Sequence, residues 1–306
     1  MKVAALDLGS NTFLCLIAEA EKGTIKNIIH DQVEMVRLGQ GLSANKRFHP
    51  EALERADRAL AQFSQIIAEH QPEKILAMAT SAARDAENKE DLFALGRKHG
   101  IPIEIIPGAQ EAEITYQGAT SGLQDLGQDL MVLDIGGGST EFIFGRGRQL
   151  ISGKSLDIGC VRLTEKFIQA QPTPAEQIKA VQDYVSLELE KINSIIPSDF
   201  KLKQIVAVAG TPTTLAAADI GEFIPSKIDG FVFTKETLEQ WLNKLAGASV
   251  EEKVTFGIPR GRADVILIGV IILIRTLEKL GQDQLTVSTR GVRYGVALEM
   301  ARRFIS

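Results

Sequence analysis

Short apolar runs alternate with amphipathic stretches along the chain, and this pattern predicts an α/β protein. Runs of strand length are followed by segments whose apolar residues recur every three or four positions, as on one face of a helix. The clearest such helix begins at Pro50 and ends near His70. In the first half we expect strands at 2–7, 12–19, 24–30, 74–80 and 103–106, and helices at 50–70 and 108–118. A further, polar helix is expected between the strands 74–80 and 103–106.

The second half repeats this plan, with strands first and helices after them. Expected strands lie at 130–134, 140–145, 149–156, 205–209 and 284–288, and expected helices at 160–169, 174–194, 235–246, 249–255, 262–280 and 293–304. An alanine-rich helix is also expected after Gly210. Because strands and helices alternate over short connections, the chain should form mixed sheets flanked by helices.

A chain of 306 residues suits two domains, since each is then long enough to bury its own core. We expect the first domain at residues 1–123 and the second at 124–294. The C-terminal helix at 295–306 is expected to complete the first domain. The segment 124–128, between a helix and a strand, is the expected hinge.

A short polar phrase occurs twice, each time between two apolar runs. The copies are Asp7-Leu8-Gly9-Ser10-Asn11-Thr12 and Asp134-Ile135-Gly136-Gly137-Gly138-Ser139-Thr140. Each predicts a strand, a tight turn and a strand, and the turn leaves N–H groups uncovered to accept an anion such as phosphate. The aspartate before it can hold a divalent cation. A lone turn of this kind is more often a plain hairpin, but two copies predict related halves whose loops face each other across a phosphate-sized cleft.

Charged residues at two helix starts are further candidates. Ser81 and Arg84 follow a buried strand. Arginine in a first helical turn opposes the helix dipole, so helix stability does not explain Arg84, and phosphate binding is the favoured interpretation. Glu111 also lies in a first turn. There the dipole favours an acid, so the residues alone favour an ordinary helix start.

Two more turns have both a functional and an ordinary structural interpretation, and the sequence does not decide between them. Gly210, Thr211 and Thr213 lie where a strand runs into a helix, which is either an anion site or a capped helix start. The segment Ser288–Gly295 holds two arginines and two glycines. It is either a basic wall of the cleft or a plain turn.

Composition narrows the class of protein. The net charge of −5 argues against nucleic acid binding through a broad basic face. The longest apolar run, Val265–Ile274, is too short to span a membrane. A core strand follows Met1-Lys2 directly, so we expect no signal peptide and a soluble, cytoplasmic protein without membrane partners. Cys15 and Cys160 are expected to be small buried residues.

The chain offers no obvious set of nucleophile, base and orienting residue, because its serines and threonines at turns have no histidine nearby in the sequence. Covalent catalysis is therefore disfavoured. Direct attack by water or a hydroxyl group on a bound phosphoryl group fits the candidates better.

These motifs resemble those of the exopolyphosphatase/guanosine pentaphosphate phosphohydrolase (Ppx/GppA) family, within the actin/hexokinase/Hsp70 superfold (ribonuclease H-like domains). The length is similar to that of its short two-domain members. The resemblance extends over almost the whole chain, in this order: Asp7–Asn11, Ala79–Ala86, Gly108–Ala112, Asp134–Glu141, Gly210–Ala216 and Ser288–Gly295.

The resemblance implies roles for particular residues. Glu111 matches an acid thought to orient and deprotonate the attacking water. Asp134 and Glu141 match residues implicated in holding Mg²⁺ and the phosphate chain, with Asp7 opposite them, and Arg84 matches a phosphate ligand. Three positions depart from the family pattern and leave their effects open: Gln110 and Glu113 replace a commoner acid and an arginine, and Thr289-Arg290 stands where an acid is usual.

We therefore hypothesise a Mg²⁺-dependent hydrolase that releases the terminal phosphate from polyphosphate or guanosine pentaphosphate (pppGpp). Glu113 and the acidic net charge favour shorter or nucleotide-linked substrates. The alternatives are a non-catalytic sensor of polyphosphate or an alarmone, an ATP-dependent kinase of the same superfold and, more remotely, a filament protein. The family often forms dimers, so a homodimer is a further expectation, although the helix Val265–Leu280 is expected to be core rather than interface.

Overall fold

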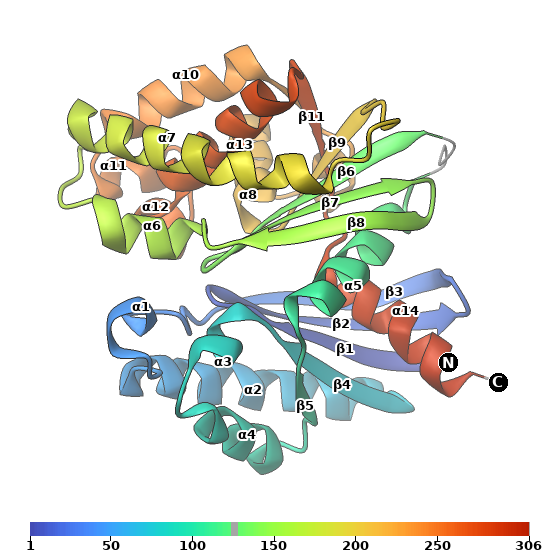
Figure 1. Cartoon of the computed structure of the whole chain (residues 1–306). Helices are drawn as coiled ribbons and strands as arrows, with labels where there is room; N and C mark the ends of the chain where they lie inside the picture. The colour runs from blue at the N-terminus through green and yellow to red at the C-terminus, as the bar shows by residue number, and fades with distance from the viewer. Residues whose placement is uncertain (124–127, 306) are drawn as a thin grey trace. The chain divides into compact units, whose positions relative to one another are not determined.

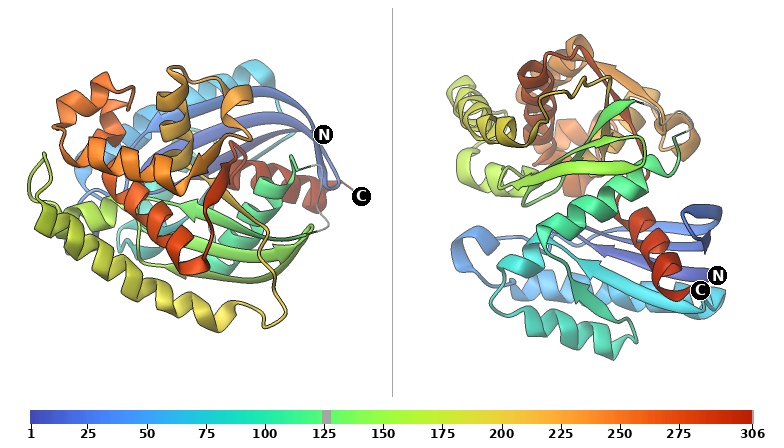
Figure 2. Two further views of the ribbon diagram at one scale, coloured as in Figure 1. Left: turned by 90° about the horizontal axis from the view of Figure 1, so that it is seen from above. Right: turned by 45° about the vertical axis from the view of Figure 1, so that its right-hand side comes forward.

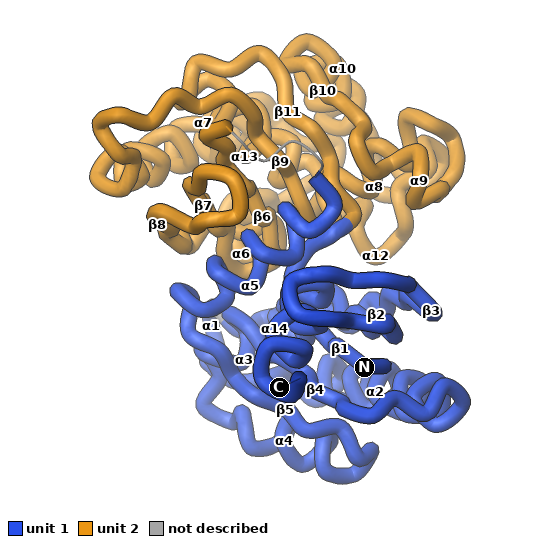
Figure 3. The backbone as a smooth tube through the Cα atoms, turned by 90° about the vertical axis from the view of Figure 1, so that its right-hand side faces the viewer, with its two compact units in different colours: residues 1–124, 290–306 blue, residues 125–289 orange. Residues whose placement is uncertain are grey.

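The computed structural model describes residues 1–123 and 128–305 and divides into two compact units. Unit 1 comprises Met1–Gln124 and Arg290–Ser306, and unit 2 comprises Asp125–Thr289 (Figure 3). Unit 2 is therefore inserted in the sequence between the two segments of unit 1. Most of the expected hinge, residues 124–127, lies outside the described residues.

The sheet of unit 1 has five strands in the order β3-β2-β1-β4-β5. β1 pairs antiparallel with β2 and β2 with β3, whereas β4 runs parallel to β1 and β5 parallel to β4. The strands are β1 (Lys2–Leu8), β2 (Thr12–Glu21), β3 (Thr24–Met35), β4 (Lys74–Ala79) and β5 (Ile103–Ile105).

Helices cover both faces of this sheet, because alternate residues of its buried strands are apolar on each side (Figure 1). Leu6 of β1 packs in the cluster that includes Phe63 of α2, whereas Ala5 packs in the cluster that includes Ile114 of α5 and Val296 of α14. The helices of unit 1 are α1 (Leu42–Asn45), α2 (Pro50–His70), α3 (Ser81–Asp85), α4 (Lys89–Lys98), α5 (Gly108–Thr120) and α14 (Val292–Phe304).

The sheet of unit 2 repeats this topology. Its order is β10-β11-β9-β6-β7-β8, in which β6, β7, β8, β9 and β11 take the places of β1 to β5 with the same parallel and antiparallel pairings. β10 is an additional antiparallel edge strand. The strands are β6 (Asp129–Ile135), β7 (Thr140–Arg146), β8 (Gln149–Leu156), β9 (Gln204–Val208), β10 (Val232–Thr234) and β11 (Gln284–Val287). The predicted α/β class, with two duplicated mixed sheets flanked by helices, is confirmed.

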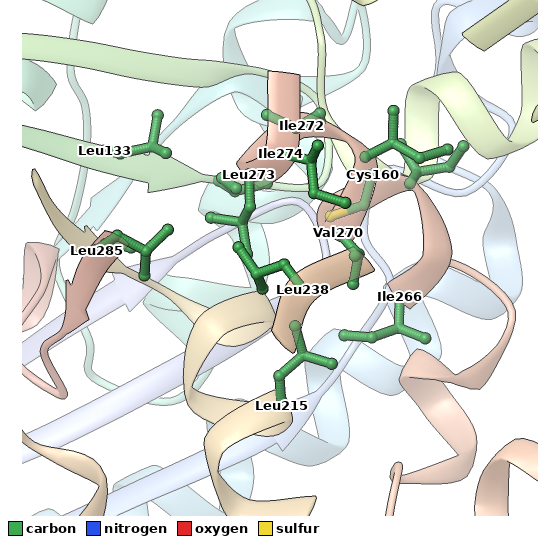
Figure 4. Packing of buried hydrophobic residues seen from close by; sticks show 14 of the residues in the cluster. Leu133, Cys160, Leu215, Leu238, Ile266, Val270, Ile272, Leu273, Ile274 and Leu285 are labelled. Carbon is green, nitrogen blue, oxygen red and sulfur yellow. The ribbon is translucent and has the colours of Figure 1, made fainter. Parts of the chain in front are cut away.

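The core of unit 2 is built around one apolar helix (Figure 4). Eleven of the fifteen residues of that helix, α13, are buried, so its expected role as core is confirmed. Leu133 of β6 and Leu215 of α8 pack in the same cluster. The helices are α6 (Cys160–Phe167), α7 (Ala175–Leu189), α8 (Gly210–Ile220), α9 (Pro225–Ile228), α10 (Lys235–Ala246), α11 (Val250–Thr255), α12 (Arg260–Ala263) and α13 (Ile266–Leu280).

Some boundaries differ from those predicted. The expected helix 262–280 is two helices, α12 and α13, separated at Asp264-Val265, and the expected helix 174–194 ends as a 3₁₀ turn at Glu190–Ile195. The short elements α1, α9 and β10 were not predicted, since three or four residues carry too little periodicity to recognise. Cys15 and Cys160 are buried free thiols, as expected. Within the described residues, no helix combines the length and the apolar character needed to cross a membrane.

Candidate active site

The first polar turn, between β1 and β2, presents its amides rather than its carbonyls. The Asn11 carbonyl accepts the N–H groups of Val36 and Arg37, at 3.0 and 2.8 Å, and the Ser10 carbonyl accepts that of Gly39 at 2.8 Å. The N–H groups of Ser10 and Asn11 have no hydrogen-bond partner among the residues that the structure describes. They are therefore open donors for an anion, and phosphate binding at this turn stays a prediction.

The side chain of Asn11 is a second sign of a ligand at this turn. The residue is 5% exposed, and neither its Oδ1 nor its Nδ2 has a hydrogen-bond partner in the described part of the chain. A buried amide left unpaired costs about 1–3 kcal/mol, so such groups usually have a function or a ligand. The neighbouring Ser10 hydroxyl lies 2.9 Å from that of Ser81, at the start of α3.

Arg84 and Glu111, which the sequence offered as separate candidates, form an ion pair within unit 1. Arg84 Nη1 donates to Glu111 Oε2 at 2.6 Å and to the Ile106 carbonyl at 3.0 Å. The Glu111 side chain is 7% exposed and that of Arg84 is 24% exposed. Burial raises the pKa of the Glu111 carboxyl above its ordinary value, although the charge and hydrogen bond of Arg84 lower it. A buried carboxylate with a raised pKa suits a general base.

Glu111 stands on a helix that is held by close helix packing. α5 crosses α14 so closely that a Cβ added at Gly118 would lie 2.2 Å from the Gly291 carbonyl oxygen. A Cβ added at Gly295 would lie 1.9 Å from the Ile114 oxygen. Figure 2 shows the two helices side by side. Glycine on both helices therefore permits the contact that places α5.

The C-terminal motif contributes a salt bridge close to Asp7. Arg293 donates from Nε and Nη2 to the two carboxylate oxygens of Asp31, at 2.7 Å each, and the Tyr294 hydroxyl donates to Asp31 at 3.2 Å. Burial by itself lowers the pKa of Arg293, but the carboxylates of Asp31 and Asp7 more than offset this, so that its pKa is raised. Arg293 therefore remains charged on the same side of unit 1 as Asp7.

The second polar turn, between β6 and β7, follows the same scheme as the first. Its carbonyls at Gly136, Gly137 and Gly138 accept hydrogen bonds from residues at the start of α6, including the Arg162 side chain at 2.7 Å. The N–H groups of Gly137, Gly138 and Ser139 have no such partner within the described residues. In each unit, then, the segment that follows the third strand, β3 or β8, donates to the carbonyls of the turn and leaves the turn amides for an anion.

Asp134 and Glu141 lie directly opposite each other on β6 and β7, and Ser155 lies opposite Glu141 on β8. Glu141 is 1% exposed, and its Oε1 accepts hydrogen bonds from the hydroxyl groups of Ser139 and Ser155, at 2.8 and 2.7 Å. Cross-strand neighbours have Cβ atoms about 5 Å apart, so both carboxylates can reach one ion.

This donor set fits Mg²⁺, which prefers oxygen ligands and commonly takes one or two protein carboxylates together with water and phosphate oxygens. No cluster of three or more acidic, histidine or cysteine side chains with metal-binding geometry occurs among the described residues. Two carboxylates from unit 2 therefore leave most of the coordination sphere to water and substrate. Asp7 belongs to unit 1, and its part in metal binding stays a prediction.

The start of α8 is the third candidate phosphate site. The preceding Ala209 has a φ of +72°, which is rare for a residue with a side chain and is often found at functional sites. The Thr213 hydroxyl donates to the Ala209 carbonyl, and Thr211 is 1% exposed. An anion at the start of α8 would therefore accept hydrogen bonds from backbone amides rather than from these hydroxyl groups. Phosphate binding at Gly210, Thr211 and Thr213 stays a prediction.

Sequence reasoning missed Arg262, whose guanidinium lies against this helix start. A Cβ at Gly210 would lie only 2.0 Å from Arg262 Cζ, so glycine there leaves space for the guanidinium. Arg262 is 8% exposed and forms no ion pair with a carboxylate in the described residues. Burial lowers its pKa, opposed by the nearby Cys160 thiol. The signal in the sequence was slight: two arginines around Gly261 before an apolar helix.

A model of the "Ppx/GppA phosphatase family" matches residues 16–304 of the chain. The chain belongs to this family. Membership makes it a phosphoanhydride hydrolase, and it confirms the resemblance noted from the motifs.

Relatives in the Ppx/GppA family carry two kinds of name. "Exopolyphosphatase 2" of Mycobacterium tuberculosis is 35% identical over 98% of both chains. "Guanosine-5'-triphosphate,3'-diphosphate pyrophosphatase" of Photobacterium profundum is 30% identical over 97% of this chain and 59% of its own length. The crystal structure of an exopolyphosphatase-like protein covers 100% of this chain and 99% of its own, with 30% identity and a TM-score of 0.93. The Aquifex aeolicus Ppx/GppA family member gives 32% identity and a TM-score of 0.82 over the same shares.

Proposed function

We propose that this protein releases the terminal phosphate from inorganic polyphosphate, pppGpp or both, by attack of a water molecule that Glu111 activates. The observation that carries the proposal is the buried ion pair of Glu111 with Arg84. Burial raises the pKa of the carboxyl group, and the arginine still favours its ionised form. An ionised carboxylate of this kind can accept a proton from water, which contributes about 10²–10⁴-fold to a rate.

In this proposal, phosphate groups bind to the free amides of the polar turn in unit 1 and, in unit 2, to those of the polar turn and of the α8 start. Charge is supplied by Arg84 in unit 1 and by Arg262 in unit 2. Hydrogen bonds from amides and guanidinium groups that are already in place stabilise the charge that develops on phosphoryl oxygens during transfer. The buried and unpaired amide of Asn11 is explained if it binds a phosphoryl group at the turn of unit 1.

Asp134 and Glu141 are the residues proposed to hold Mg²⁺, with Asp7 as a third candidate. When bound, the ion would neutralise charge on the phosphoryl groups and lower the barrier to departure of the shortened substrate, which is the leaving group. The serine hydroxyls on Glu141 orient that carboxylate in advance. Phosphate release measured at increasing Mg²⁺ and after chelation, in the wild type and in Asp134→Asn, tests this assignment.

The substrate is tested by comparing phosphate release from polyphosphates of different length and from pppGpp. Relatives named for either substrate support both possibilities. The acidic side chain of Glu113 near Glu111 and the net charge of −5 favour a short or nucleotide-linked substrate. We expect catalytic efficiency to decline, rather than rise, as the polyphosphate chain lengthens. Tight binding without turnover in Mg²⁺ would instead identify a sensor.

Replacement of Glu111 by glutamine tests the general base. The change keeps the shape of the side chain but removes its proton affinity, so kcat should fall about 10²–10⁴-fold while binding of tripolyphosphate persists. Glu69→Gln, at an exposed position of α2 in the same unit, is the matched control and should retain kcat. A wild-type rate in Glu111→Gln would remove this residue from the base role.

A further inference from the structure

Arg84 uses only part of its guanidinium group for contacts within unit 1. Nη1 makes both bonds, to Glu111 Oε2 and to the Ile106 carbonyl. The guanidinium has five N–H donors in a rigid plane. Neither Nε nor Nη2 has a hydrogen-bond partner among the described residues. One edge of the plane is therefore committed to the carboxylate, and the other edge is available.

The side chain that carries this available edge is partly accessible. The Arg84 side chain is 24% exposed, three times as much as that of Glu111. Paired N–H groups on one edge of a guanidinium match two oxygens of a phosphoryl group. The hydroxyl contact between Ser10 and Ser81 also ties α3, which carries Arg84, to the turn whose amides have no partner in the described residues. An anion at that turn is therefore near the helix that carries this arginine.

Resting on the proposed function, we propose that Arg84 is a positioning residue that joins base to substrate: Nη1 holds the Glu111 carboxylate while the Nε–Nη2 edge binds the terminal phosphoryl group. One rigid plane then sets the place of the base relative to the phosphorus atom. A phosphate ligand alone would contribute only to binding, whereas this arrangement contributes to the chemical step, because an error of about 1 Å in such positioning can cost about 10²-fold in rate.

Among the described residues, Glu111 has no other charged partner that could take over this role. The charge and hydrogen bond of Arg84 are the only effects besides burial on its pKa among the described residues. α14, which packs on α5, directs Arg293 to Asp31, and Arg302 and Arg303 to Glu299. Loss of Arg84 should therefore leave burial alone to set the pKa.

The test compares Arg84→Lys with Arg84→Ala, with tripolyphosphate and Mg²⁺ as the probe. Lysine keeps the charge but lacks the planar edge. We expect kcat to fall about 10²-fold in Arg84→Lys, with KM changed less than about tenfold and the acidic limb of the pH profile of kcat/KM in place. Arg84→Ala should lose as much kcat and move that limb upward by about one to three pH units. Added guanidinium ion should restore part of its kcat.

The control pair is Arg97→Lys and Arg97→Ala, since Arg97 is an exposed arginine of unit 1 that pairs with Glu90 on its own helix. Both should retain kcat and KM. If the Arg84 variants only raise KM, with kcat and the acidic limb of the pH profile unchanged, Arg84 is a phosphate ligand alone and the inference is overturned. A loss that follows only the folded fraction overturns it as well. Wild-type protein that releases no phosphate overturns the proposed function together with the inference.

Discussion

At the scale of single residues, unit 2 buries two cations, Arg262 and Lys253. Arg262 lies against the α8 start without an ion-pair partner in the described residues. Lys253 is fully buried, and its ammonium group donates to Gln171 Oε1. Burial of a charge is costly unless a partner or ligand compensates it. We expect that a bound substrate compensates the cost of burying Arg262. The buried charge of Lys253 has a structural role, since its ammonium group binds Gln171.

Replacement of Arg262 by leucine should weaken anion binding without weakening the fold. The loss of a charge-assisted hydrogen bond of about 1.5–3 kcal/mol raises the dissociation constant for tripolyphosphate about tenfold or more. Because a buried unpaired charge is removed, the free energy of unfolding should not fall. Calorimetric titration and urea unfolding measure the two effects. Arg260→Leu, at an exposed neighbouring position, is the control, and an unchanged affinity in Arg262→Leu would exclude it from the site.

Replacement of Lys253 by methionine should remove a rise of stability with pH. Burial lowers the pKa of Lys253 from 10.5 to about 8, and Asp264 opposes this. Below pH 8 both states carry the proton, and the folded state bears the full cost of the charge. Between pH 8 and 10.5 the folded state binds fewer protons than the unfolded state, so stability rises with pH.

The size of this rise follows from about 1.4 kcal/mol for each pKa unit. Between pH 7.5 and 9.5, urea unfolding should show the wild type gaining about 2 kcal/mol relative to Lys253→Met. Lys179→Met, at an exposed position on α7, should show no comparable difference. Parallel pH dependence in the wild type and Lys253→Met would mean that this ammonium group is not the source.

Sequence reasoning reached individual site residues but not their partnerships. Arg84 was recognisable because its place in a first helical turn opposes the helix dipole. Its pairing with Glu111 joins residues 27 positions apart on different helices, which no local pattern encodes. Arg262 was missed for the same reason, because its contact with Gly210 exists only in the tertiary structure.

At the scale of elements, the crossing of α5 and α14 controls the position of Glu111. Gly295→Ala would place a methyl group 1.9 Å from the Ile114 carbonyl oxygen and force the helices apart. We expect the free energy of unfolding to fall by about 1–3 kcal/mol and kcat to fall more than KM rises, because α5 carries the base. Gly247→Ala is the control, since its nearest neighbour would be 3.7 Å away. Wild-type stability and kcat in Gly295→Ala would show that the helices adjust freely.

Most long elements were predictable because their apolar residues follow a clear period. α2 agrees with its predicted bounds, 50–70, since proline begins it and apolar residues mark one face. The break between α12 and α13 was not predictable, because the apolar run from Val265 continues the helical pattern. The break instead accompanies tertiary contacts, in which Gln171 donates to the Asp264 carbonyl.

At the scale of the whole molecule, the two units share a topology but have different chemistry at the same point. Asp7 and Asp134 occupy equivalent positions before the polar turns. In unit 2 the residue opposite Asp134 is Glu141, whereas in unit 1 the residue opposite Asp7 is Leu14. The pair of carboxylates suited to a metal therefore exists only in the second copy. The repeated phrase in the sequence indicated the duplication, but this difference requires the strand register.

Deletion of residues 292–306 should unfold unit 1 and leave unit 2 folded. α14 provides much of the apolar cluster on one face of the unit 1 sheet, which includes Val3, Leu16 and Met78. Hydrogen exchange should show loss of protection in β1, β2 and β4, with β6, β7 and β9 protected as in the full chain. Deletion of residues 305–306 alone is the control. Simultaneous loss of protection in both units would mean that they fold as one cooperative body.

The insertion of unit 2 within unit 1 has a consequence for synthesis on the ribosome. β1 to β5 are translated first, yet the helix that covers one face of their sheet is translated only after the whole of residues 125–289. At 5–20 residues per second this delay lasts roughly 10–30 s. During that interval unit 2 can fold while the nascent unit 1 sheet still exposes apolar surface to chaperones. A ribosome that stalls before α14 yields a chain whose Glu111 helix lacks its packing partner, so activity should require translation of α14.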